Sequence, residues 1–229
     1  ASGLRHRHPD RSAAPPAPGI ADALWHQLSD QPSEPVRILA LDAGLALLVD
    51  HGLATSTVAA RLAASVRADP YSVVIAGLGV LGGPLHGRAS VAVHELYQRA
   101  EEQGGAAALG RLQRQGLSVP GLGHAVYRHQ DPRYGALMEQ VIAGWGGDAR
   151  LGVVFEVRDL LAERSDRVPN VDLAIGALTY LAAMPANAGE VLFAVARTAG
   201  WLAHALEEYD EPPLRFRTRG HYVGPRPEG

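Results

Sequence analysis

Apolar and polar residues alternate with helical spacing along almost the whole chain after residue 19. Residues 36–49 (VRILALDAGLALLV) are apolar on nearly every side and form a run too long for an ordinary strand, which indicates a buried helix. No segment favours a strand and no internal repeat is present, so we predict an all-α fold. The predicted helices cover residues 20–28, 36–49, 58–67, 71–81, 88–103, 106–115, 133–145, 149–163, 171–183 and 191–209.

Short polar signals predict where several of these helices begin. Asp69-Pro70 and Asp131-Pro132 each combine a capping carboxylate with a proline at the first helical position. Thr55 or Ser56 can cap the helix that follows it, and Asn187 opens an Asn-x-x-Glu capping box for the last helix. These signals set boundaries that a structure can test residue by residue.

The composition narrows the class of protein. The 229 residues are enough for one domain or one and a half, and the 47% hydrophobic content is that of a globular protein. The net charge of −3 argues against a generic nucleic-acid binder. The absence of cysteine excludes disulfides and a thiolate nucleophile. No apolar run reaches the ~18 residues of a membrane span, and residues 1–19 are a polar, Pro-rich arm, so we expect a cytoplasmic protein without a membrane partner.

The densest polar cluster lies at residues 119–134, between two apolar runs. Gly121 and Gly123 let the backbone approach a ligand closely because they carry no Cβ, and His124 follows at once. The Asp-Pro signal would set Arg133 in the first turn of a helix. An imidazole and a guanidinium together suit an anionic, oxygen-rich ligand. The alternative is a surface loop whose histidine and arginine contact only water.

Two other patterns could indicate a dinucleotide-binding loop and a zinc site, but neither stands in the sequence context that such a site requires. Gly77-Leu-Gly79-Val-Leu-Gly82 matches the G-x-G-x-x-G of dinucleotide-binding loops, but its third glycine precedes a helix break instead of opening a helix. A zinc site could be drawn from His51, His86 and His124, but each of them is alone in its segment. We therefore predict neither a dinucleotide site nor a metal.

Three further residues stand out by their positions. His86 lies at a helix break, where its ring need not pack on a helix face. Asp172 lies at the start of an apolar helix, where it either serves chemistry or only caps the helix. Arg197 lies in the middle of a mostly apolar helix, where its charge is costly unless it meets an anion or a carboxylate.

Five motifs, taken in order, resemble the signature of the citrate synthase family. They are Leu48-Val-Asp-His-Gly-Leu-Ala-Thr-Ser-Thr57, Gly83-Pro-Leu-His-Gly87, Gly121-Leu-Gly-His-Ala-Val-Tyr-Arg-His-Gln-Asp-Pro-Arg133, Pro169-Asn-Val-Asp172 and Ala196-Arg-Thr-Ala-Gly-Trp201. The closing Arg217-Thr-Arg-Gly-His-Tyr-Val-Gly-Pro225 is similar to that family's C-terminus. The resemblance runs from about residue 20 to residue 225. It implies an all-α citrate synthase-like fold and a Claisen condensation of acetyl-CoA with oxaloacetate to give citrate and CoA.

The resemblance also implies catalytic roles for three residues. His86 would polarise the thioester carbonyl of acetyl-CoA, and Asp172 would remove a proton from its methyl group. His124 would donate a hydrogen bond to the oxaloacetate ketone, and hydrolysis of citryl-CoA would complete the reaction. This agrees with the chemistry, because removal of a weakly acidic α-proton needs a dry site and a donor at the developing enolate oxygen.

The resemblance also implies which residues bind the two substrates. His51, Arg133 and Arg197 would hold the oxaloacetate carboxylates, and Arg217 would reach into a neighbouring subunit's site. No permanently bound cofactor is implied, since the acyl-CoA is a substrate. The residues expected against the CoA nucleotide are Val119, Pro120, Gly121, Leu122 and Gly123.

The chain departs from the family pattern at several positions. Gly52 stands where the family usually has Glu, while Arg88 and Ser90 stand where it has Gly and Asn. Leu173 replaces an aromatic residue after Asp172, which leaves the acyl group open and allows propionyl-CoA. The chain also matches only about the last three-fifths of a family member. A companion chain that supplies further N-terminal helices is therefore an open alternative.

We predict two domains and an assembly of subunits. Residues 20–87 and 188–229 would form the larger domain, residues 88–187 the smaller one, and buried apolar helices without cover favour a homodimer. The alternatives for function are a citryl-CoA lyase, a 2-methylcitrate synthase-type enzyme, and a catalytically weak partner or regulatory subunit of a citrate synthase.

Overall fold

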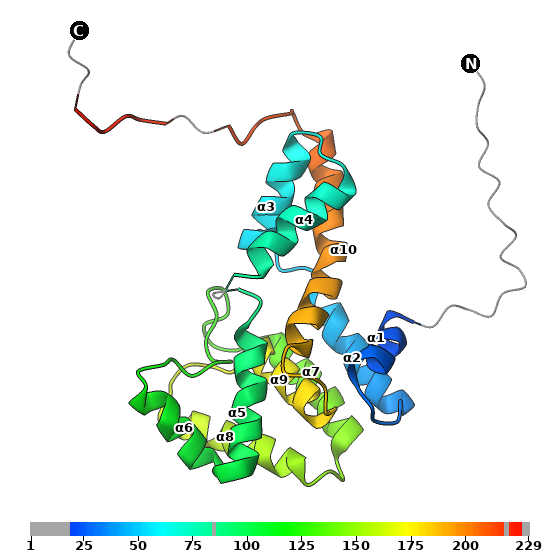
Figure 1. The fold of residues 1–229 in the computed structure, drawn as a ribbon, viewed down its shortest axis with the longest axis vertical. Helices are drawn as coiled ribbons and strands as arrows, with labels where there is room; N and C mark the ends of the chain where they lie inside the picture. Colours follow the sequence, from blue (N-terminus) through cyan, green and yellow to red (C-terminus); the bar gives the residue numbers. More distant parts are fainter. Residues whose placement is uncertain (1–18, 84–85, 218–219, 226–229) are drawn as a thin grey trace, which may run out of the picture.

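The described part of the chain folds into helices joined by loops, of which the segment between α6 and α7 is long (Figure 1). The computed structural model describes residues 19–83, 86–217 and 220–225, so most of the predicted arm and Pro84-Leu85 lie outside the described residues. Within those ranges there is no strand, and one isolated antiparallel bridge joins Leu122 to Pro169. The prediction of an all-α fold is confirmed. The helices are α1 (Ile20–Leu28), α2 (Pro35–Leu48), α3 (Thr55–Ser65), α4 (Pro70–Leu81), α5 (Ala89–Gln103), α6 (Gly105–Arg114), α7 (Pro132–Trp145), α8 (Arg150–Arg164), α9 (Val171–Leu181) and α10 (Ala188–Asp210).

The longest helix, α10, connects two groups of helices. Near its C-terminal end it packs against α3 and α4, which stand together at the top of the view in Figure 1. Nearer its N-terminus it contacts α2, α5 and α9, while α2 also packs on α1 and α7. Helices α5, α6 and α8 form the remaining group around α9. The loops between these groups carry most of the polar motifs.

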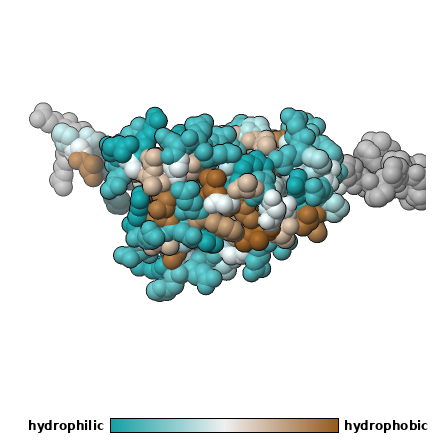
Figure 2. Space-filling view, turned by 90° about the horizontal axis from the view of Figure 1, so that it is seen from below, coloured by the Kyte–Doolittle hydropathy of each residue, from teal (hydrophilic) through white to brown (hydrophobic). Residues whose placement is uncertain are grey.

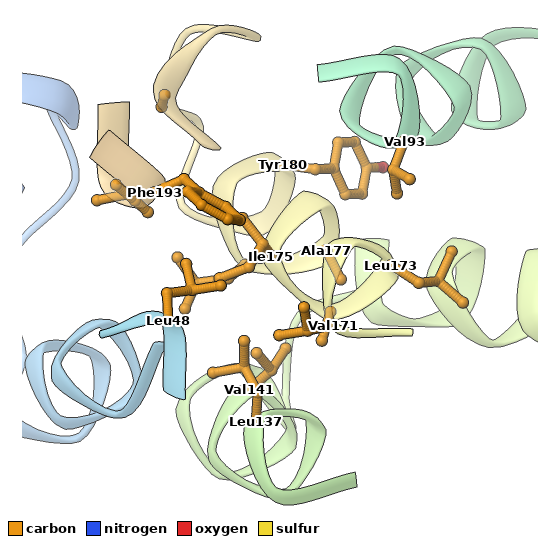
Figure 3. Packing of buried hydrophobic residues seen from close by; sticks show 14 of the residues in the cluster. Leu48, Val93, Leu137, Val141, Val171, Leu173, Ile175, Ala177, Tyr180 and Phe193 are labelled. Atoms are coloured by element: carbon orange, nitrogen blue, oxygen red, sulfur yellow. The ribbon is translucent and has the colours of Figure 1, made fainter. Parts of the chain in front are cut away.

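Helix α9 lies at the centre of the core. Nearly all of its residues are buried, and Figure 3 shows side chains from the neighbouring helices packed around it. Leu173 and Ile175 are almost wholly excluded from solvent, as are Leu48 of α2 and Leu137 of α7. A helix that is apolar on all sides must be surrounded by others. This packing fixes the N-terminus of α9, where Asp172 lies.

The helix starts follow the sequence signals in part. Asp69 accepts hydrogen bonds from Tyr71 N and Ser72 N, and Asp131 accepts one from Arg133 N, so both predicted caps are confirmed. The capping box was wrong, because Asn187 has α-helical backbone angles and its side chain caps nothing. The prediction that Thr55 or Ser56 caps α3 was also wrong, since α3 begins at Thr55 itself and its N-cap makes no side-chain bond.

The surface mixes hydrophobic and hydrophilic residues. On the face seen from below in Figure 2, hydrophobic residues gather in separate patches between hydrophilic ones. Among the described helices, none has the length and apolar character that crossing a membrane requires.

Candidate active site

Three histidines from distant parts of the chain line one cavity of about 830 Å³. His51 comes from the loop after α2, His86 from the bend between α4 and α5, and His124 from the long loop before α7. The rings of His51 and His124 lie 4.7 Å apart, centre to centre. The other lining residues are small or apolar: Leu53, Ala54, Thr55, Val80, Gly83, Ala125 and Val126. The cavity therefore presents three polar rings against apolar walls.

His86 is oriented by the start of α3. Its Nε2 lies 2.8 Å from the hydroxyl of Ser56, a residue with no solvent exposure. On its other side the ring meets the edge of Phe193 on α10, with centroids 5.7 Å apart. A ring held on two sides keeps one direction, so His86 offers its remaining nitrogen from a fixed position.

The loop that carries His124 is tied to the start of α9. Gly123 N donates to Val168 O at 2.7 Å, and Asn170 N donates to Gly121 O at 3.0 Å. Both glycines have left-handed backbone angles, and a Cβ on Gly121 would press against Leu173 at 3.0 Å. The glycine pair thus allows a close approach to α9, which sets His124 near the helix that bears Asp172.

The hydrogen bonds of His124 assign its protonation. Its Nδ1 accepts the backbone N–H of Val126 at 3.0 Å, so the proton sits on Nε2 and Nε2 is a donor. Burial lowers the pKa of His51, His86 and His124 below the ordinary value. Nearby guanidinium charge acts in the same direction on each of them. All three rings are therefore neutral near pH 7 and can donate without carrying charge.

Arg133 is buried behind the histidine pair. Its guanidinium donates to both carboxylate oxygens of Asp131, at 2.9 and 2.8 Å, and lies over the ring of Tyr127. That ring contacts both His51 and His124, with centroids 5.3 and 5.0 Å away. Burial alone would raise the pKa of Asp131, but its bonds to Arg133 hold it below the ordinary value.

Arg197 is buried in the middle of α10, as its apolar setting in the sequence suggested. Its Nε donates to Leu48 O at 2.8 Å, and its guanidinium lies over Phe193, whose ring also contacts His86. One guanidinium nitrogen, NH1, is buried and has no hydrogen-bond partner within the described part of the chain. A buried donor without a partner is costly, so this nitrogen is suited to an anionic ligand.

Asp172 lies in the first turn of α9, where Asn170 caps the helix and Asp172 does not. It is partly buried, and burial raises its pKa to about 6, although the charge of Arg133 acts in the opposite direction. Its side chain is not among the residues that line the histidine cavity. A carboxyl that titrates near neutral pH is suited to accept a proton.

The remaining predicted residues lie apart from the histidine cavity. Arg217 is exposed beyond the C-terminal end of α10. Val119 and Leu122 line a hollow of about 480 Å³ between α6 and α8, Pro120 lines a second hollow and Gly123 a third. Gly121 is buried against α5 and α9.

The fold places the first two glycines of the G-x-G-x-x-G match inside a helix. Gly77 and Gly79 lie inside α4, and a Cβ on Gly77 would come within 2.6 Å of the Trp201 ring. Gly77 therefore serves close helix packing and not a phosphate loop. Although three histidines share a cavity, no group of three histidine, aspartate or glutamate side chains in the described ranges is placed to bind a metal ion.

Sequence reasoning missed the residues that support the histidines. Ser56 was interpreted as a cap, and Asp131 only as a cap, although its carboxylate also holds the Arg133 side chain and Val171 N. Phe193 and Tyr127 carried no signal, because an aromatic residue beside an arginine is ordinary in sequence. A search for acidic residues two positions before a buried arginine could have found Asp131.

The chain resembles known proteins over most of its length. A family model described as "Citrate synthase, C-terminal domain" matches residues 1–219. "Citrate synthase 2" of Bacillus subtilis (strain 168) is 32% identical over 211 residues, which cover 90% of this chain and 56% of that protein. The chain thus spans little more than half the length of this relative.

Two solved structures share the fold. Citryl-CoA lyase from Hydrogenobacter thermophilus superimposes with a TM-score of 0.81 at 24% identity, over 92% of this chain and 86% of that one. Citrate synthase from Thermoplasma acidophilum, in a ternary complex with carboxymethyl coenzyme A and oxaloacetate, superimposes with a TM-score of 0.78 at 26% identity, over 94% of this chain and 59% of that one. The five ordered motifs agree with these matches, and the match to the family model over residues 1–219 shows that this chain belongs to the citrate synthase family.

Proposed function

We propose that this chain carries the active site of a citrate synthase-like enzyme, which condenses acetyl-CoA with oxaloacetate to give citrate and CoA. The observation that carries the proposal is the cavity shared by three neutral imidazoles, with two buried guanidinium groups behind its walls. Neutral donors and fixed positive charges are what an enolate and a dicarboxylate require.

In the proposed reaction, His86 donates to the thioester oxygen while Asp172 takes the α-proton. The Ser56 contact leaves one ring nitrogen of His86 to face the substrate. Asp172 titrates near pH 6, so it is ionised at neutral pH yet is a stronger base than an ordinary carboxylate. The enolate then attacks the ketone of oxaloacetate, to which His124 donates from Nε2, and the product is citryl-CoA. Water then breaks its thioester bond and releases citrate and CoA.

Oxaloacetate would be held by His51, Arg133 and Arg197. The partnerless nitrogen of Arg197 supports this assignment, because a carboxylate would satisfy it. Arg133 is already fixed by Asp131 and would present its remaining donor without reorganisation.

The nucleotide of the acyl-CoA would lie along the segment from Val119 to Gly123. The hollow lined by Val119 and Leu122 also contains Arg164 and Arg167, and the next hollow shares Arg167. Apolar walls suit a base, and arginines suit phosphate groups. The Thermoplasma complex holds a coenzyme A derivative together with oxaloacetate, which supports two substrates bound side by side.

Closure between the two predicted domains would complete this site. His51 and His86 belong to residues 20–87 and His124 to residues 88–187, so the cavity lies between segments of both. Movement of the smaller domain toward the larger would bring Asp172 to the cavity and exclude water.

A homodimer is the assembly we propose, through the exposed face of α3 and α4. Helix α4 contains no charged residue, and Tyr71, Ile75 and Leu78 are 83%, 68% and 41% exposed along it. An uncharged apolar face can cover its own copy about a two-fold axis. Ile75→Glu should convert the dimer to monomers in light scattering, whereas the matched change Leu39→Glu, at an exposed position of α2, should not. Dimers that persist in both variants would contradict this interface.

Release of CoA thiol with oxaloacetate and a panel of acyl-CoAs tests the activity. We expect turnover with acetyl-CoA or propionyl-CoA, its loss in His86→Gln, and unchanged turnover in His26→Gln, which alters an exposed histidine of α1. A parallel incubation with citryl-CoA separates hydrolysis to citrate from cleavage to acetyl-CoA and oxaloacetate. Cleavage of citryl-CoA without formation of citrate would favour a lyase. Absence of CoA release with oxaloacetate and every acyl-CoA tested would refute the proposal.

A further inference from the structure

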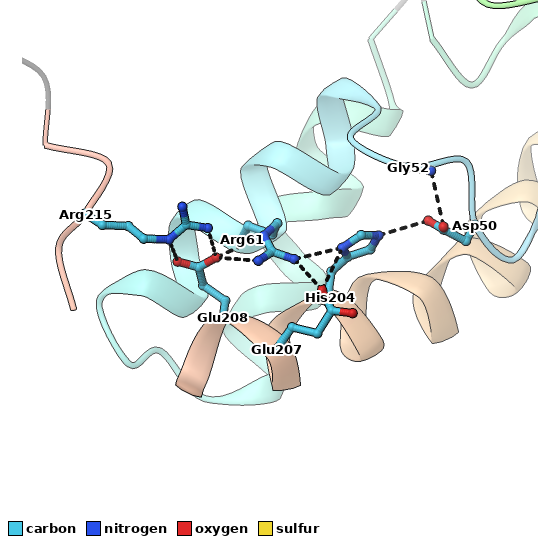
Figure 4. A network of polar contacts seen from close by, with 7 residues as sticks. All are labelled: Asp50, Gly52, Arg61, His204, Glu207, Glu208 and Arg215. Atoms are coloured by element: carbon cyan, nitrogen blue, oxygen red, sulfur yellow. Dashed lines mark hydrogen bonds and ion pairs between the residues drawn. The ribbon is translucent and has the colours of Figure 1, made fainter. Parts of the chain in front are cut away.

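A network of charged side chains joins α3, α10 and the segment that follows α10 (Figure 4). Glu208 has no solvent exposure, and its carboxylate is bound by both Arg61 of α3 and Arg215. Arg61 also donates to Glu207 at 2.8 Å. A buried carboxylate held by two guanidinium groups is costly to disturb, so these groups form a fixed frame.

His204 links this frame to the loop after α2. Arg61 NH1 lies 3.0 Å from Nδ1 of His204, and Nε2 of His204 lies 3.1 Å from the Asp50 carboxylate. Because a guanidinium nitrogen can only donate, Nδ1 accepts and Nε2–H donates to Asp50. The same carboxylate also accepts Gly52 N at 3.2 Å. The contact therefore spans the backbone on both sides of His51.

One face of α10 contacts residues 48–50 over two helical turns. Arg197 donates to Leu48 O, and a Cβ on Gly200 would collide with the carbonyl of Val49. His204 follows one turn later on the same face. These three positions of α10 thus contact three successive residues at and just after the end of α2, which are Leu48, Val49 and Asp50.

His51 depends on this support for its direction. In the described ranges no hydrogen bond of its side chain is found, and its ring contacts the rings of His124 and Tyr127. Gly52 has a backbone φ of 58°, which a side chain would strain, so the turn itself is easily remodelled. The backbone contacts, more than the ring contacts, decide where the imidazole points.

We propose that His204 is a positioning residue, which through Asp50 holds the His51 loop in the geometry that binds the substrate carboxylate. This deepens the proposed function and rests on it for the identity of the substrate. His204 itself lies outside the cavity.

Four variants separate positioning from general stability. His204→Leu removes both hydrogen bonds, and His204→Gln keeps an amide able to donate to Asp50. His221→Leu is the matched control, since His221 is exposed. Asp50→Asn is the fourth variant and repeats the test from the exposed side, because the Asp50 side chain is 48% exposed and its replacement is compatible with folding.

The first readout is the imidazole signal of His51 in carbon–proton NMR spectra, identified by its absence from His51→Gln. In the wild type, burial lowers the pKa of His51. In His204→Leu and Asp50→Asn we expect the signal to shift and its titration midpoint to move upward as the loop gains solvent. His204→Gln should restore the wild-type signal, and His221→Leu should not change it.

The second readout is kinetic. KM for oxaloacetate should rise about tenfold in His204→Leu while kcat changes less than about threefold, because binding and not chemistry is affected. An unchanged His51 signal in both His204→Leu and Asp50→Asn would overturn the proposal even if the enzyme is active. If the wild type turns over no substrate, the proposed function fails, and the NMR comparison still decides whether His204 positions His51.

Discussion

Asp172→Asn should make the folded protein more stable at neutral pH while abolishing turnover. Burial raises the pKa of Asp172 from 3.8 to about 6, so the folded state holds this proton more tightly than the unfolded chain does. The folded state is therefore favoured most below pH 3.8, loses stability as the pH rises toward 6, and carries the full penalty above pH 6. Asparagine keeps the shape of the side chain and has no charge to bury.

The size of the penalty follows from the two pKa values. The gap between 3.8 and about 6 corresponds to about 3 kcal/mol at most, and solvent contact of this partly buried group reduces it to about 1–3 kcal/mol. Roughly half of the change falls between pH 5 and pH 8. The advantage of Asp172→Asn over the wild type should grow by about 1 kcal/mol across that range.

Urea unfolding at pH 5 and pH 8 measures this difference. Tryptophan fluorescence is a suitable signal because Trp25, Trp145 and Trp201 are all buried. Asp42→Asn, at an exposed position of α2, is the control, and its effect should be the same at both pH values. If Asp172→Asn is less stable than the wild type at pH 8, or if its advantage does not grow with pH, the carboxyl is not strained by burial.

Two further substitutions test the packing and the buried ion pair. Gly77→Ala should cost about 1–3 kcal/mol, because its Cβ would lie 2.6 Å from the Trp201 ring. Gly152→Ala, with nothing within 4 Å, should gain about 0.5–1 kcal/mol; equal melting temperatures would contradict this account. Asp131→Asn should cost about 3–5 kcal/mol at pH 7 by leaving Arg133 unpaired. Since the pKa of Asp131 is lowered, this cost should shrink as the pH falls below 3.8, which urea unfolding can follow.

The sequence predicted the helices of the described ranges because helices depend on short-range patterns. His51, His86 and His124 were assigned to one site through the family resemblance, and in the fold they line one cavity. Each predicted helix has a counterpart in the described ranges, usually within two residues at each end. The Asp-Pro signals at Asp69 and Asp131 were correct because a cap needs only its own two or three neighbours. Ser56 failed as a cap because α3 begins one residue before it, and its hydroxyl instead contacts His86 from another segment.

What the sequence could not supply is the set of contacts made across the fold. The pattern at Gly77 matched a phosphate loop because a motif of glycines is the same in a tight turn and in a tight helix contact. Only Trp201, more than a hundred residues away in the chain, decides between them. The neutral tautomer of His124 likewise depends on a backbone N–H two residues on, which a sequence does not orient.

Arg197 differs from the residues that support the histidines in how clearly the sequence singles it out. Arg197 could be singled out because burying a charge inside an apolar helix costs free energy. Such a residue is therefore expected to be paired with an opposite charge or to bind an anion. His204 could not, because a histidine near glutamates on a partly exposed helix face is ordinary in any sequence. Residues that bind a ligand therefore stand out by violating the local pattern, whereas residues that position them obey it. The second kind is found only by following contacts outward from the cavity, as the path from His51 through Asp50 to His204 does.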